Sequence, residues 1–148
     1  MKIAVDTNVL VYAEGVNGNE LRQAAWTVIN RIRSETPMVP AQVLGELFNV
    51  LDRKAKFTRS RARNAILDWS DIFTVIDTTS DILLKGADLS AEHNLQIWDA
   101  VILCAASQAG CRLLLSEGMQ DGFAWGGVTV VNPFAARPHP LLAALLKR

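Results

Sequence analysis

Acidic side chains stand at five positions of this sequence where they could take part in chemistry. Asp6 directly follows a short apolar run, and Glu46 lies beside the apolar stripe of a helical pattern. Asp99 opens the most apolar helical segment, and Glu117 and Asp121 belong to the stretch SEGMQDG. A glutamate buried in an apolar face costs several kcal/mol unless it is paired or bound to a metal. The pattern therefore favours a shared acidic site.

Such a group of carboxylates is suited to holding a divalent cation. Crowded carboxylates repel one another and become partly protonated unless a cation holds them together. Their hard oxygen atoms favour Mg²⁺ or Mn²⁺ over zinc, and Mg²⁺ keeps several waters when one or two carboxylates bind it. A cation of this kind can activate water, orient a phosphate and neutralise developing charge. We therefore expect hydrolysis of phosphodiester bonds without a serine or cysteine nucleophile.

Each acid also has a simpler interpretation. Asp6 and Asp99 could cap helices, since aspartate is a favoured N-cap residue. Glu46 could lie at the edge of its helix in water, and Glu117 and Asp121 could be ordinary solvated loop residues. A phosphatase with Asp6 as the nucleophile is a further alternative, but the residues that follow, Thr-Asn-Val, do not supply the second acid that this chemistry normally needs.

Short strands and longer helices alternate along the chain. Helices usually cover both faces of a parallel sheet built this way, and ligands collect at the carboxyl ends of its strands. A helix is also expected directly after Asp6. Apolar and β-branched runs predict strands at 2–5, 37–40, 74–77, 112–116 and 128–131, and helical periodicity predicts helices at 19–33, 42–51, 65–72, 79–93 and 97–109.

Basic residues gather in one segment, although the whole chain has no net charge. Its 15 basic and 15 acidic residues cancel, so any nucleic-acid site must be local. The basic cluster comprises Arg53, Lys54, Lys56, Arg59, Arg61 and Arg63. The first four of these are candidates for contact with RNA phosphates, and the alternative is a solvated helical face.

The length and composition of the chain predict one globular domain over residues 1–148, with an apolar tail at 135–148 that could form a helix. Cys104 and Cys111 have no spacing typical of zinc sites, and we expect both to be reduced thiols in or near the core. With neither a signal peptide nor a membrane-spanning run expected, a cytoplasmic location fits best.

Several motifs resemble the PIN-domain family and, more narrowly, the VapC-type toxins of bacterial toxin–antitoxin pairs. The resemblance covers nearly the whole chain. It rests on VDTNVLVYA at 5–13, Glu46, WDAVILCAA at 98–106, LLLSEGMQDG at 113–122 and GGVTVVNPF at 126–134, in this order and spacing.

This resemblance implies a three-layer α/β/α fold with a five-stranded parallel sheet and Mg²⁺- or Mn²⁺-dependent endoribonuclease activity. Asp6 and Asp99 match the principal metal-binding acids of the family, and Glu46 matches its helical acid. Asn8 and Ser116 match its supporting polar residues. Members of the family often form dimers and are silenced by a small antitoxin protein, so a homodimer and an antitoxin are the expected partners.

One position departs from the family pattern. Related sequences commonly have an acid where this chain has Gly118, so a full second metal site is in doubt unless Glu117 or Asp121 substitutes for it. Two hypotheses follow. The chain is either a ribonuclease in which a neighbouring acid serves, or a degenerate PIN module that binds RNA or a protein without cleaving.

Overall fold

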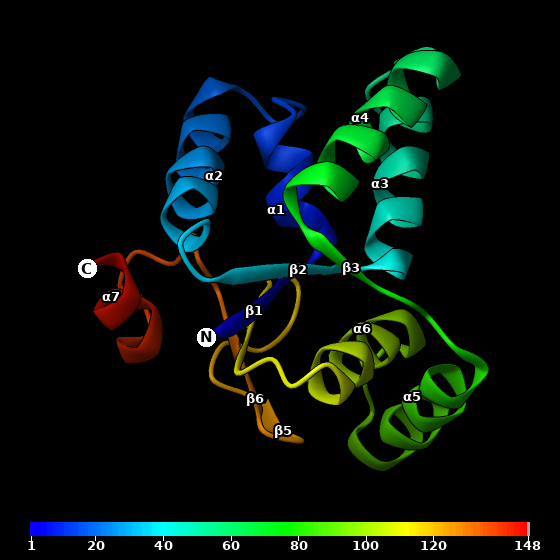
Figure 1. The fold of residues 1–148 in the computed structure, drawn as a ribbon, viewed down its shortest axis with the longest axis vertical. Helices are drawn as coiled ribbons and strands as arrows, with labels where there is room; N and C mark the ends of the chain where they lie inside the picture. The colour runs from blue at the N-terminus through cyan, green and yellow to red at the C-terminus, as the bar shows by residue number, and fades with distance from the viewer. Residues whose placement is uncertain (148) are drawn as a thin grey trace.

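The computed structural model describes residues 1–147, which form a sheet with helices on both of its faces (Figure 1). The strands are β1 (Lys2–Val5), β2 (Thr36–Pro40), β3 (Thr74–Ile76), β4 (Leu113–Leu115), β5 (Ala124–Trp125) and β6 (Val128–Val131). The helices are α1 (Thr7–Ala13), α2 (Asn19–Ile32), α3 (Ala41–Arg53), α4 (Arg59–Ile72), α5 (Ser80–His93), α6 (Ile97–Gln108) and α7 (Pro140–Leu146).

The sheet has the order β3-β2-β1-β4-β6-β5. The first five of these strands are parallel, which confirms the predicted parallel α/β fold. The two-residue strand β5 was not predicted, and it pairs antiparallel with β6. In Figure 1, helices α1 to α4 lie on one side of β1, β2 and β3, and α5 and α6 lie on the other.

Helix and strand positions agree with the sequence pattern to within a few residues, except for α4. This helix begins at Arg59, well before the apolar periodicity that starts at Ala65, because the Thr58 side chain caps it by accepting a hydrogen bond from the Arg61 N–H at 3.1 Å. Part of the basic cluster is therefore helical.

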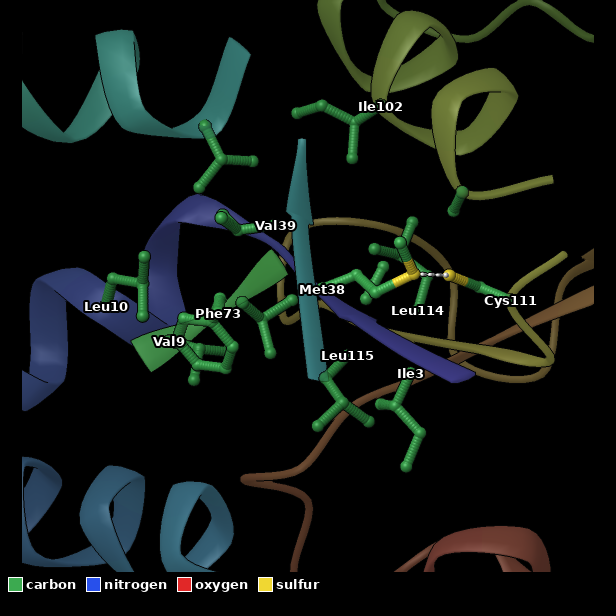
Figure 2. Packing of buried hydrophobic residues seen from close by; sticks show 14 of the residues in the cluster. Ile3, Val9, Leu10, Met38, Val39, Phe73, Ile102, Cys111, Leu114 and Leu115 are labelled. Carbon is green, nitrogen blue, oxygen red and sulfur yellow. Dashed lines mark hydrogen bonds between the residues drawn. The ribbon is translucent and has the colours of Figure 1, made fainter. Parts of the chain in front are cut away.

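The core of the protein lies between the sheet and its helices. Figure 2 shows Ile3, Leu114 and Leu115 of the central strands packed among side chains from the neighbouring elements, and all three are fully buried or nearly so. Burying one such side chain contributes roughly 1.5–3 kcal/mol. Cys104 and Cys111 are both buried and free, as expected for reduced thiols.

The close packing of α5 against α6 depends on Gly86. A Cβ atom at this position would come within 2.7 Å of the Val101 side chain and 3.1 Å of its backbone, so only glycine allows the two helices to approach this closely. This contact fixes α6, whose first turn carries Asp99. No helix within residues 1–147 is long and apolar enough to cross a membrane.

Candidate functional site

Asp6 lies at the junction between β1 and α1, where the chain leaves the centre of the sheet. Its backbone N–H continues the β1–β4 pairing by donating to the Leu115 carbonyl at 2.9 Å. Its side chain is only 7% exposed and accepts two hydrogen bonds, from the Thr7 N–H and from the Ser116 hydroxyl, both at 2.7 Å. Asp6 is therefore the N-cap of α1 and also a rigidly held carboxylate at the carboxyl edge of the sheet.

Ser116 holds this carboxylate from the neighbouring strand. It directly follows β4 and is fully buried, and its hydroxyl donates to Asp6 and accepts a hydrogen bond from the Met119 N–H at 3.3 Å. The Ser116 N–H donates to the Val131 carbonyl at 3.0 Å, which continues the sheet into β6. One side chain thus orients Asp6 and shapes the loop that begins at residue 117.

Glu46 approaches the same region from α3, and it is half-buried. The Gln42 amide, one turn earlier, donates to its Oε1 at 3.1 Å, and the Thr7 hydroxyl donates to its Oε2 at 3.1 Å. Thr7 therefore contacts both acids, through its N–H to Asp6 and through its hydroxyl to Glu46.

Asp99 lies in the first turn of α6 and is half-buried. The capping interpretation of this residue is wrong, because Gln96 is the N-cap and its side chain accepts the hydrogen bond from the Asp99 N–H at 3.0 Å. The Asp99 carboxylate is therefore not needed to cap the helix and is free to act elsewhere.

Asp6, Glu46 and Asp99 are close enough to influence one another electrostatically. The pKa of Asp99 is raised from 3.8 to about 6, mostly by burial and in smaller part by the charges of Asp6 and Glu46. Burial also raises the pKa of Glu46, and the charge of Asp6 adds to this effect, while hydrogen bonds from Gln42 and Thr7 oppose it. The three acids therefore share a region of concentrated negative potential, which favours a cation.

The two loop acids have other partners. Glu117 accepts a hydrogen bond from the Tyr12 hydroxyl, and this contact, with burial and the charge of Glu117, raises the pKa of Tyr12 to about 12. Asp121 is exposed, and its Oδ1 accepts from the Asn132 N–H at 2.9 Å, which fastens the loop to the chain after β6. Gly118 is exposed, and a Cβ atom there would meet nothing within 4 Å.

The candidate metal ligands Asp6, Glu46 and Asp99 are all carboxylates. Their oxygen atoms suit Mg²⁺ or Mn²⁺ better than a softer metal, which prefers sulfur or nitrogen ligands. Across residues 1–147, however, no three His, Cys, Asp or Glu side chains lie close enough to form a ready-made metal cluster. A cation that uses one or two carboxylates and fills its remaining positions with water does not need such a cluster.

Two hollows are lined in part by residues of α3. One, of about 470 Å³, includes Gln42, Glu46, Asn49 and Thr78 in its lining. The other, of about 330 Å³, lies between α1 and α3 and is named here the α1–α3 hollow. It is lined by Asn8, Val11, Tyr12, Val16, Asn17, Val50 and Lys54.

The basic cluster surrounds the connection between α3 and α4, at the end of this helix pair that lies away from the sheet in Figure 1. Arg59 forms an ion pair with Asp52 at 3.6 Å, and the Arg61 guanidinium lies 3.8 Å from the Phe57 ring centroid. Lys54 differs from its neighbours Arg53 and Lys56 because it shares the α1–α3 hollow with Asn8.

Sequence reasoning did not identify four residues that position the site, and for three of them a signal was present. Gln42 stands four residues before Glu46, Gln96 stands three before Asp99, and Thr7 is adjacent to Asp6. Local spacing could have found these three. The fourth, Tyr12, is 105 residues from its partner Glu117, and no sequence pattern links them.

The fold and the arrangement of acids define the class of protein, an open parallel α/β domain with acidic side chains gathered at the carboxyl edge of its sheet. A family model for the PIN domain matches residues 3–120, so the chain belongs to the PIN-domain family.

Solved structures of toxin–antitoxin systems share this fold. The VapBC2 complex of Rickettsia felis, bound to a promoter DNA fragment, is 17% identical, with 80% of this chain and 89% of that chain covered and a TM-score of 0.62. VapC20 of Mycobacterium tuberculosis, a sarcin–ricin loop cleaving toxin, is 20% identical over 76% and 86%, with a TM-score of 0.60. A toxin–antitoxin complex from Klebsiella pneumoniae is 22% identical over 89% and 98%, with a TM-score of 0.61. No curated protein matches the chain.

Proposed function

We propose that this protein is a metal-dependent endoribonuclease and the toxin of a type II toxin–antitoxin pair. The observation that carries the proposal is the convergence of acids from separate elements: Thr7 donates hydrogen bonds to both Asp6 and Glu46, and the charges of these two acids raise the pKa of Asp99. Membership of the PIN-domain family and the fold shared with toxins such as VapC20 support the same conclusion.

In this proposal Asp6 and Asp99 hold the cation, Mg²⁺ or Mn²⁺, and Glu46 completes the acidic site. The cation would supply an activated water and neutralise charge on the phosphate. Ser116 and Thr7 keep the Asp6 carboxylate in one orientation through their two hydrogen bonds. Such fixed support matters because a misplaced ligand weakens both metal binding and catalysis.

Glu117 and Asp121 take a smaller part in this proposal, because each already has a hydrogen-bond partner away from the three central acids. They support the loop that follows β4. Asn8 supports the site from the first turn of α1, and Arg53, Lys54, Lys56 and Arg59 supply positive charge for RNA phosphates.

The decisive experiment incubates the purified protein with total RNA in Mg²⁺, Mn²⁺ or EDTA. Asp6→Asn, purified identically, reveals contaminating nuclease, and asparagine can still cap α1. We expect discrete cleavage that requires metal and disappears in the variant. Cleavage that is equal in wild type and variant, or unaffected by EDTA, would sink the proposal.

A second candidate function is a PIN module that binds RNA or protein without cleaving it. The observation that favours it is Gly118, together with the lack of a ready-made cluster of three metal-ligating side chains within residues 1–147. Gly118→Asp separates the two candidates, and the open space around residue 118 allows the new side chain without strain. A large gain of activity would support the degenerate module, and little change would support the active nuclease.

Partners and location follow from the same proposal. The VapBC2 and Klebsiella pneumoniae structures are toxin–antitoxin complexes, which supports a small antitoxin as the partner of this chain. The proposal also includes a homodimer, formed by a single domain over residues 1–148 and located in the cytoplasm. Light scattering on the purified protein tests the dimer, and co-purification with the product of an adjacent small open reading frame tests the antitoxin.

A further inference from the structure

The α1–α3 hollow has features that no part of the cleavage chemistry uses. Its volume of about 330 Å³ is at the lower end of the range of small-ligand pockets, about 300–1,000 Å³. Its lining is more polar than apolar: Asn8 and Asn17 provide amides that can both donate and accept hydrogen bonds, and Val11, Val16, Val50 and the ring of Tyr12 contribute the apolar part. This combination suits a flat, polar-edged ring such as a nucleobase.

Two residues that line the hollow are linked to the acidic residues, one by its place in the chain and one by a hydrogen bond. Asn8 follows Thr7, whose N–H and hydroxyl donate to Asp6 and Glu46. One turn later on α1, the Tyr12 hydroxyl donates to Glu117, which follows the Ser116 that orients Asp6. A ligand that contacts Asn8 in the hollow would therefore lie one residue along α1 from Thr7, which contacts Asp6 and Glu46.

Charge distinguishes the α1–α3 hollow from the larger one. The residues that line it include a cation, Lys54, and no acid. The residues that line the 470 Å³ hollow include an acid, Glu46, and no cation. A polyanion that approaches the acidic site is repelled on the Glu46 side and attracted on the Lys54 side.

We propose that the α1–α3 hollow binds one unpaired RNA nucleotide next to the bond that is cut, with Asn8 and Asn17 contacting the edge of the base and Lys54 contacting a phosphate. The inference rests on the proposed ribonuclease function and adds to it a determinant of sequence preference. Unpaired bases are the usual targets of sequence-specific RNA recognition because their edges and faces are accessible.

Binding is measured first, so that the test does not depend on catalysis. Short single-stranded RNA oligomers that differ at one base are titrated against Asp6→Asn protein in EDTA, and fluorescence anisotropy reports affinity. Lys54→Ala should weaken binding of every oligomer several-fold and reduce the slope of log affinity against log salt by about 1. Asn17→Ala should instead reduce the difference in affinity between oligomers.

Matched controls are Lys147→Ala and Asn30→Ala, which change the same residue types at exposed positions outside the hollow. Val50→Phe fills the hollow and should weaken binding without a change of charge. Circular dichroism checks that each variant is folded, and Lys54 and Asn17 are exposed enough for their truncation to be tolerated.

The outcomes separate the nucleotide site from the ribonuclease proposal. If wild type cleaves RNA but Lys54→Ala and Asn17→Ala bind as their controls do, the nucleotide site is wrong and the ribonuclease stands. If Asp6→Asn binds RNA with the expected pattern but wild type cleaves nothing, the nucleotide site stands and the ribonuclease is wrong. If no oligomer binds, the nucleotide site is overturned.

Discussion

The five candidate site acids fall into two regions that differ in how the chain holds them. Asp6, Glu46 and Asp99 belong to a strand end and two helices. Burial raises the pKa of Glu46 and of Asp99; the charge of Asp6 adds to both shifts, and the charge of Glu46 adds to that of Asp99. Glu117 and Asp121 belong to the loop after β4, and each accepts a hydrogen bond that fastens that loop. Negative charge is therefore concentrated in the first region, whereas in the second region each carboxylate has its own hydrogen-bond donor.

An acid that follows the end of a strand is therefore not necessarily part of the site. Both regions lie after parallel strands, where ligands are expected. In the first region, hydrogen bonds orient the carboxylates of Asp6 and Glu46, and both charges still raise the pKa of Asp99. In the second, the Tyr12 hydroxyl and the Asn132 N–H satisfy the carboxylates. The comparison predicts large effects on activity in the first region and small ones in the second.

Asp99→Asn is expected to cause the largest loss of activity. The same change is expected to increase the stability of the metal-free protein. Loss of a metal-binding acid should reduce cleavage at least about 100-fold. In EDTA, however, the variant should be more stable than wild type near pH 7 by roughly 1 kcal/mol, a figure reduced from the full pKa shift because Asp99 is only half-buried.

The sign follows from the pKa of Asp99, which is raised from 3.8 to about 6. The folded state holds this proton more tightly than the unfolded chain, so wild type loses stability as the pH rises through this interval. Urea unfolding in EDTA between about pH 4 and 7 should show the two proteins converging at the acid end. Asp68→Asn, an exposed change on α4, is the control. A variant less stable than wild type at neutral pH would show that Asp99 is not under repulsion.

Ser116→Ala is expected to rank second. It removes the buried hydrogen bond to Asp6 and the acceptor for the Met119 N–H, without touching a carboxylate. Loss of a supporting residue of this kind typically reduces metal affinity or activity about 10- to 100-fold. Stability should fall by about 1–3 kcal/mol because Asp6 is left with one partner fewer in a buried position.

A metal titration of cleavage rates distinguishes this effect from unfolding. If Ser116 acts by orienting Asp6, the variant should need more Mg²⁺ for half-maximal activity and recover in part at high Mg²⁺. Ser107→Ala, which removes another side-chain hydrogen bond, to the Gly126 carbonyl at 2.6 Å, should leave the metal requirement unchanged. An unchanged metal requirement in Ser116→Ala would mean that its role is confined to the loop.

Most of the fold follows from the sequence because its signals are local. The buried strands are apolar runs, and the helices repeat apolar residues at helical spacing. Strand β5 was missed because two residues between glycine-rich turns carry no periodicity, and the start of α4 was missed because a polar cap determines it. These are features that an apolar pattern does not record.

The candidate site follows only in part, for the same reason. Strand order places Asp6 beside Ser116 once a parallel sheet is assumed, since both residues directly follow strands. The contact between Tyr12 and Glu117 depends instead on side-chain directions 105 residues apart. Sequence could therefore propose Glu117 as a substitute acid, but only the structure shows that its carboxylate already has a partner.

Asp121→Ala is expected to affect stability more than activity. The change removes the bond to the Asn132 N–H, and an exposed hydrogen bond of this kind contributes about 1 kcal/mol. Thermal unfolding should show the loss, while cleavage should fall less than about tenfold. Asp71→Ala, on the exposed surface of α4, is the matched control. A loss of activity as large as that of Asp99→Asn would place Asp121 in the first region.

Glu117→Gln is expected to have the smallest effect on cleavage, within about threefold of wild type, since glutamine can still accept the Tyr12 hydrogen bond. Its clearest consequence is spectroscopic. Tyr12 is the only tyrosine of the chain, so the absorbance of its phenolate reports a single group. Its pKa of about 12 results from the hydrogen bond to Glu117, from burial and from the charge of Glu117, so a neutral acceptor at residue 117 should lower it part of the way toward the ordinary value of 10.

The matched control for this last change is Glu20→Gln, an exposed glutamate in the first turn of α2, which should leave the Tyr12 titration where it is in wild type. An unchanged Tyr12 pKa in Glu117→Gln would show that the two side chains are not in contact in solution. If cleavage were also lost, Glu117 would belong with Asp6, Glu46 and Asp99, and it would supply the acid that Gly118 lacks. A lowered pKa with cleavage retained would keep the two regions distinct.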